Sequence, residues 1–208
     1  MRERQGPTGV AWVDALLGAL PLAAAVVTPS AVSARLLRFA LPRLYQALER
    51  SPTRTSFVDL IPPTWYSAVS LGRINPRALA VTRAPWGSEP GTAAIVTTPL
   101  LWSASPWVQA LGLAHEGLHA IGARKWPNLL IPERAAVPML ERLRRLRTRY
   151  VNADPTPGHR ALHLLAYSLL RRQWGHPQSF LGAYRRLPDY PIRPIWMEAW
   201  PKRVSFTG

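Results

Sequence analysis

Residues 105–122 have the sequence SPWVQALGLAHEGLHAIG, which contains the clearest helix signals in the chain. Ser105 is a good N-cap, and Pro106 suits the first helical position, where its missing N–H costs no hydrogen bond. Gly122 suits the left-handed position that follows a helix end. Apolar side chains recur between these ends at helical spacing, at Trp107, Leu111, Ala114, Leu118 and Ile121. The sequence therefore predicts a helix over 106–121 with this stripe buried.

The same stretch contains an H-E-x-x-H motif, formed by His115, Glu116 and His119. Residues four apart lie one above the other on a helix, so both imidazoles can bind one Zn²⁺ ion. Glu116 is offset by about 100° from His115 on the helix, which favours a role as general base towards a zinc-bound water over a role as ligand. The motif predicts zinc-dependent hydrolysis of a peptide bond, with His115 and His119 as ligands and Glu116 as the catalytic residue.

Two strand-like runs precede the motif helix. Residues 77–84 (RALAVTRA) and 92–101 (TAAIVTTPLL) flank the turn-rich segment PWGSEPG at 85–91. They predict an antiparallel hairpin. The expected fold class is α+β and predominantly helical, with a small antiparallel sheet before the motif helix.

This strand–helix unit resembles the zincin superfamily of zinc metallopeptidases. The resemblance extends from the hairpin to Glu133, and it implies that residues 92–101 bind substrate by strand addition. Metzincins continue the motif to H-E-x-x-H-x-x-G-x-x-H, but Lys125 occupies the position of the third histidine here. The chain is therefore more similar to gluzincins, which use a Glu on a following helix, and the resemblance implies that Glu133 in ERAA is the third zinc ligand.

Several other side chains compete with Glu133 for this role. Glu133 lies three residues before Ala136 and seven before Leu140, which places it on the inward face of a helix predicted over 132–150. Its separation from His119 is shorter than in the best-known gluzincins. The alternatives are His159 and His163, an i,i+4 pair on a helix predicted over 158–174, together with Asp154, Glu141 and Glu198. The sequence leaves this choice open.

Residues 1–50 are predicted to be an apolar and amphipathic helical segment that packs on a zincin-like domain formed by residues 51–208. An apolar run at 15–27 is shorter than the about 20 residues that span a membrane, so we expect a buried or interfacial helix. A signal peptide or an N-terminal anchor that contacts a membrane is the alternative. Residues 33–50 have amphipathic helical spacing, and Pro42 is expected to kink or divide that helix.

The remaining segments are rich in structure breakers. Residues 51–76 contain Pro62-Pro63 and Asn75-Pro76 and are predicted to form a loop. The Pro/Trp-rich tail from Gln178 onward is expected to wrap the domain without regular structure.

Composition limits the classes of function. The chain of 208 residues is 48% hydrophobic, enough for a full core. It has no cysteine, which excludes disulfides, thiolate metal sites and a cysteine nucleophile. Its net charge of +15 is compatible with an anionic partner, nucleic acid included, besides a peptide or protein substrate. The sequence contains no P-loop, G-x-G-x-x-G or recognised nucleic-acid-binding signature.

Three functions are therefore compared. The first is a zinc metallopeptidase. The second is a zincin-like scaffold with a structural or assembly role, for example a phage or secretion component, whose metal is structural or lost. The third is a basic nucleic-acid-binding protein in which the motif is accidental. A cytoplasmic or virion-associated location is favoured over export.

Overall fold

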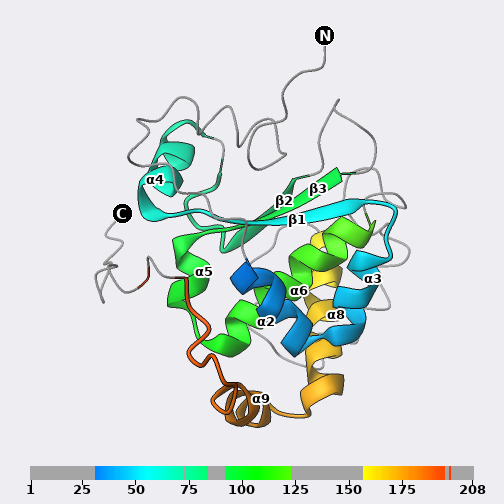
Figure 1. The fold of residues 1–208 in the computed structure, drawn as a ribbon. Coiled ribbons are helices and arrows are strands. Elements are labelled where there is room, and N and C mark those ends of the chain that lie inside the picture. Colours follow the sequence, from blue (N-terminus) through cyan, green and yellow to red (C-terminus); the bar gives the residue numbers. More distant parts are fainter. Residues whose placement is uncertain (1–30, 73, 84–91, 123–156, 195–196, 198–208) are drawn as a thin grey trace.

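The computed structural model describes residues 31–72, 74–83, 92–122, 157–194 and 197. Within these ranges the fold is α+β and mostly helical, with seven helices and one three-stranded sheet (Figure 1). The expected fold class is thus confirmed at this level. The apolar run at 15–27 and the helix predicted over 132–150 lie outside the described residues. None of the described helices is long and apolar enough to cross a membrane.

The sheet combines parallel and antiparallel pairing. Its strands are β1 (Arg54–Asp59), β2 (Ala80–Arg83) and β3 (Thr92–Thr97), in the order β1-β3-β2. The β2–β3 pair is antiparallel, which confirms the predicted hairpin, but β1 pairs with β3 in parallel. The expectation of a wholly antiparallel sheet is therefore wrong. Parallel neighbours need a long crossover connection, so no local turn signal in the sequence indicates that β1 pairs with β3.

Two further boundaries differ from the sequence prediction in this region. The segment 51–76, predicted to be a loop, contains β1 and α4 (Pro62–Ser70), because its tandem prolines start a helix at Pro62. The strand predicted over 92–101 ends at Thr97, and Pro99 opens the short helix α5 (Pro99–Ser103). In both cases proline occupies the first turn of a helix, whereas the sequence pattern alone indicates a loop or a continuing strand.

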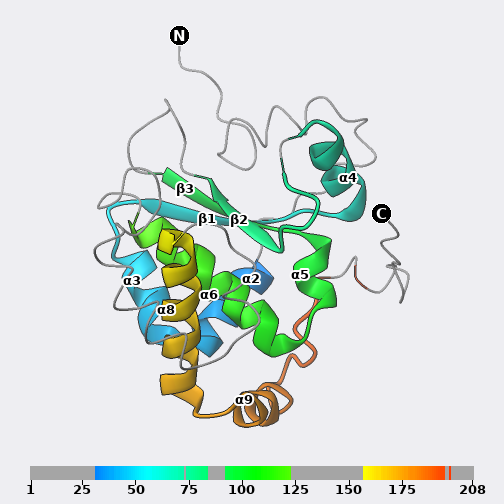
Figure 2. The same ribbon diagram turned by 180° about the vertical axis from the view of Figure 1, so that it is seen from behind.

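The two faces of the sheet are covered by different helices. Ala93 and Ile95 of β3 belong to the main core, which is formed with α2, α3, α6, α8 and α9, whereas Ala94 and Val96 face the smaller core around Trp65 of α4. This division follows from the period-two alternation of strand side chains. Figures 1 and 2 show the larger group of helices on one side of the sheet and α4 at its opposite side.

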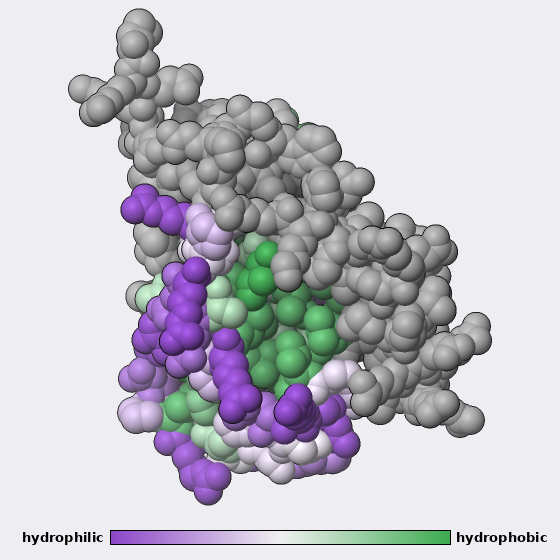
Figure 3. Space-filling model, turned by 90° about the vertical axis from the view of Figure 1, so that its right-hand side faces the viewer, coloured by the Kyte–Doolittle hydropathy of each residue, from purple (hydrophilic) through white to green (hydrophobic). Residues whose placement is uncertain are grey.

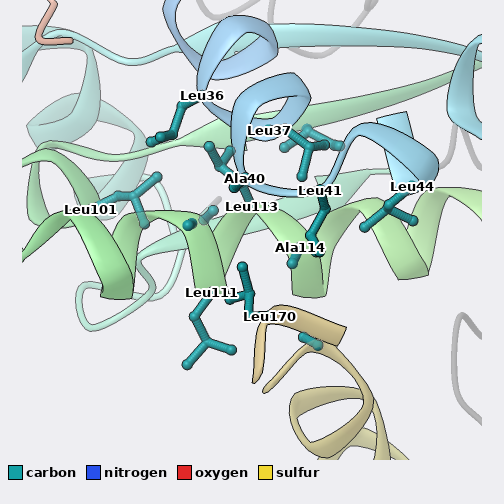
Figure 4. Close-up of a cluster of buried hydrophobic side chains, with 14 of the residues drawn as sticks. Leu36, Leu37, Ala40, Leu41, Leu44, Leu101, Leu111, Leu113, Ala114 and Leu170 are labelled. Carbon is teal, nitrogen blue, oxygen red and sulfur yellow. The ribbon is translucent and has the colours of Figure 1, made fainter. Parts of the chain in front are cut away.

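The N-terminal helices are divided where the sequence predicts. α2 (Ala31–Ala40) and α3 (Pro42–Glu49) flank Leu41, because Pro42 has no N–H and occupies a first helical position. Both pack on α6, where a Cβ added at Gly117 would lie 3.4–3.5 Å from leucine side chains of these two helices. Figure 4 shows leucines of α2 and α3 directed at the buried face of α6.

The predicted motif helix is confirmed as α6 (Pro106–Gly122). Its burial is wider than one apolar stripe, since Ala110 and Leu113 are fully buried while Trp107 and Leu118 are only half-buried. The helix contacts β2, β3, α2, α3, α5, α8 and α9. α6 is therefore the central helix of the molecule, and its histidines lie inside the core region rather than beside it.

The C-terminal part contains α8 (Pro157–Trp174), which confirms the helix predicted over 158–174, and α9 (Pro177–Tyr184). α9 corrects the expectation that the tail lacks regular structure. Its first turn begins at Pro177, and the His176 imidazole accepts a hydrogen bond from the Gln178 N–H. Phe180 and Tyr184, four residues apart, are buried in the core.

Apolar residues are visible at the surface on one face of the described structure. Figure 3 shows them in a hollow on the face that is on the right in Figure 1, bordered on one side by hydrophilic side chains. Part of the apolar interior of the described structure is therefore exposed on this face.

Candidate metal and catalytic site

The three motif residues lie together in the second half of α6. His115, Glu116 and His119 have exposed fractions of 2%, 7% and 8%, so all three are buried in the described structure. Ionisable groups are rarely this buried unless a specific partner compensates for lost hydration. Their burial indicates a built polar site rather than an ordinary solvent-facing helix surface.

The two motif histidines approach each other as a metal-binding pair would. The Nε2 atoms of His115 and His119 are 3.0 Å apart, within hydrogen-bond range of each other. Two imidazole nitrogens on one tetrahedral zinc ion would lie about 3.3 Å apart, given Zn–N distances of about 2 Å. The ring planes are at 78°, with centroids 4.7 Å apart. The donor type and the separation of these two side chains therefore fit a shared zinc ion.

Glu116 is next to this pair but does not bind it directly. Its Oε1 atom is 3.9 Å from Nε2 of His115, beyond hydrogen-bond range. Burial raises the pKa of Glu116 to about 7, and hydrogen bonds from Thr82 act in the opposite direction. A carboxyl group whose pKa is close to neutrality is suited to accept and release a proton at physiological pH.

Thr82 is a site residue that sequence reasoning missed. It lies in β2, and its hydroxyl donates a hydrogen bond of 2.9 Å to the backbone carbonyl of Glu116. The sequence signal at Thr82 is only the alternation of side chains between the two faces of a strand. This alternation does not indicate which face packs against which helix. The contact fixes the edge strand against the motif helix.

His163 is brought to the site by α8. Its ring is stacked on that of His115, with centroids 3.9 Å apart and planes at 23°. The side chain is half-buried. Of the alternative ligands considered from the sequence, His163 is the one that the described structure places in contact with the motif. His159 lies one turn earlier in the same helix.

The described residues, as they are placed, supply fewer ligands than a zinc site needs. Among them, no group of three or more His, Cys, Asp or Glu side chains is arranged to hold a metal ion. Nearly parallel rings such as those of His115 and His163 cannot both direct their in-plane lone pairs at one nearby ion. The predicted ligand Glu133 and the alternatives Glu141, Asp154 and Glu198 lie outside the described residues.

Two details of the predicted site are corrected by the packing. β3 has a neighbour on each side, so residues 92–97 cannot bind a substrate by strand addition. Among the described strands, β2 is an outer strand that lies next to α6. The absence of a side chain at Gly112, three residues before His115, favours open space above the histidines, but a Cβ there would lie 2.8 Å from Cδ1 of Leu101. This glycine permits the close approach of α5.

A second buried carboxylate has a structural explanation. Asp59, at the end of β1, is 2% exposed and accepts hydrogen bonds from the hydroxyls of Ser33 (2.7 Å) and Thr97. Trp102 donates its indole N–H to Thr97. The cluster joins the first turn of α2 to the carboxyl ends of the two parallel strands.

Comparisons with protein-family models, with curated proteins and with solved structures found no match to this chain.

Proposed function

We propose that this protein is a zinc-dependent hydrolase of peptide bonds, in which His115 and His119 are ligands and Glu116 is the general base. The observation that supports this most is the 3.0 Å separation of the two Nε2 atoms on a buried helix, with a buried glutamate next to them. A bound zinc ion would polarise a water molecule and lower its pKa. Glu116 would accept the proton of that water and deliver it to the leaving amine.

The packing around Glu116 supports a role in proton transfer. Because the side chain is buried, its protonated form is favoured more than in water, and its pKa of about 7 matches the task. Thr82 holds the backbone of Glu116 against β2. The backbone of Glu116 is thus held by an element outside its own helix.

A peptide substrate would pair with β2. Within the described residues this strand pairs with β3 alone, and it runs next to the motif helix. An extended peptide could add to its outer edge and gain main-chain hydrogen bonds there. This replaces β3, the strand implied by the resemblance, as the substrate-binding strand.

The test has two parts. Protein dialysed against metal-free buffer and reloaded with zinc should contain one zinc ion per chain by mass spectrometry, and His115→Ala should contain none. The zinc form should hydrolyse an unstructured protein such as casein, and Glu116→Gln should not. Absence of a transition metal from the reloaded wild type would refute the proposal and favour the nucleic-acid-binding alternative. Bound zinc without hydrolysis would favour the scaffold alternative.

A further inference from the structure

We infer that His163 is the third zinc ligand, so that the site is formed by three histidines from two helices. This inference rests on the proposed function, because it needs His115 and His119 to bind zinc. His163 lies in α8, and its ring contacts that of His115 at a centroid separation of 3.9 Å. α6 and α8 pack directly against each other, which keeps the three imidazoles together.

Other donors among the described residues have roles elsewhere. The carboxylates of Glu49 and Asp189 pair with Arg38 and Arg35, and that of Asp59 accepts two hydroxyl hydrogen bonds. His176 caps α9. Of the described side chains that suit zinc, His163 is therefore the one that joins the motif pair.

Zinc binding by His163 requires a change in the orientation of its side chain. In a tetrahedral site, two imidazole centroids would lie about 5 Å apart, given Zn–N distances of about 2 Å. His115 and His119 are already at 4.7 Å, whereas His115 and His163 are at 3.9 Å. As placed, the ring of His163 is stacked on that of His115 at 23°, so zinc binding requires the His163 side chain to rotate out of this stacking. Half-burial leaves this side chain more room than the two buried histidines have.

Three histidines would also suit the chemistry. Three neutral imidazoles leave one position of a four-coordinate zinc ion for water or substrate, as catalytic zinc sites require. The set adds no negative charge beside the buried Glu116. Coordination would link α8 to α6.

The experiment measures zinc affinity by competition with a chromophoric chelator. The variants are His163→Ala, His163→Phe, His159→Ala and Glu133→Ala, each checked for folding by circular dichroism. His163→Phe keeps a flat ring that can stack on His115 but has no nitrogen donor. His159→Ala is the matched control, because it removes a histidine one turn away in the same helix.

We expect both His163 variants to lose at least about 100-fold in zinc affinity. Even the loss of a residue that only hydrogen-bonds to a metal ligand lowers metal affinity by about 10–100-fold. His159→Ala and Glu133→Ala should stay within about threefold of the wild type. Cobalt-substituted wild type should show a four-coordinate visible spectrum, which His163→Phe should lose. Wild-type affinity in His163→Phe would overturn the inference, and a loss confined to Glu133→Ala would assign the ligand to that residue. In either case zinc binding by the wild type would leave the proposed function intact, whereas its absence would refute both.

Discussion

Glu116 is the residue whose replacement best separates chemistry from structure. Because its carboxylate lies 3.9 Å from His115 and is not required as a ligand, Glu116→Gln should retain zinc. The amide cannot accept the proton, so hydrolysis should fall by about 10²–10⁴-fold. Metal analysis and casein hydrolysis on the same sample would check both parts. Unchanged hydrolysis in this variant would exclude the zincin mechanism even with zinc bound.

Thr82 provides a second test at this scale. Thr82→Val keeps the shape but removes the hydroxyl that donates to the Glu116 carbonyl. We expect a loss of about 1 kcal/mol in the free energy of unfolding, measured by urea denaturation, with zinc retained. Ser67→Ala is the control, because the Ser67 hydroxyl also donates to a backbone carbonyl, that of Pro63, but at an exposed position. It should change stability by less than about 0.5 kcal/mol. Equal losses of unfolding free energy in the two variants would mean that the Thr82 hydrogen bond contributes no more to stability than an exposed one.

At the scale of elements, the contact between α5 and α6 depends on Gly112. Alanine there would place its Cβ 2.8 Å from Cδ1 of Leu101, so Gly112→Ala should destabilise the protein by about 1–3 kcal/mol through overpacking. Gly182→Ala is the matched control in α9, where nothing lies within 4 Å of the added Cβ. That change should stabilise the protein by up to about 1 kcal/mol, from helix propensity alone. Thermal unfolding of both variants would check the opposite signs, and stabilisation by Gly112→Ala would show that Leu101 yields easily.

At the scale of the whole molecule, zinc should stabilise the fold because its ligands would join packed elements. At zinc concentrations of about 100 times Kd, the gain is about 2.7 kcal/mol, which corresponds to about 5–10 °C in Tm for a chain of this size. His115→Ala should abolish this shift without abolishing folding. Calorimetry with and without a chelator would measure it. A shift that persists in His115→Ala would indicate zinc binding elsewhere.

Much of the local structure could be predicted from the sequence. The capping residues and apolar spacing predict α6, Pro42 predicts the division between α2 and α3, and the turn-rich segment at 85–91 predicts the β2–β3 pairing. The H-E-x-x-H spacing also indicates which side chains share a helix face. These features depend on residues close together in the chain, where steric and hydrogen-bond preferences act directly.

The tertiary structure decided the rest. β1 pairs with a strand far along the chain, and the Thr82–Glu116 and His115–His163 contacts join different elements. No periodicity encodes these partners, because they depend on how α6 packs between the sheet and α8. The sequence alone determined the motif and its helix. Only the packing of distant elements decided that α6 is the central helix, that the outer strand β2 lies next to it and that His163 contacts His115.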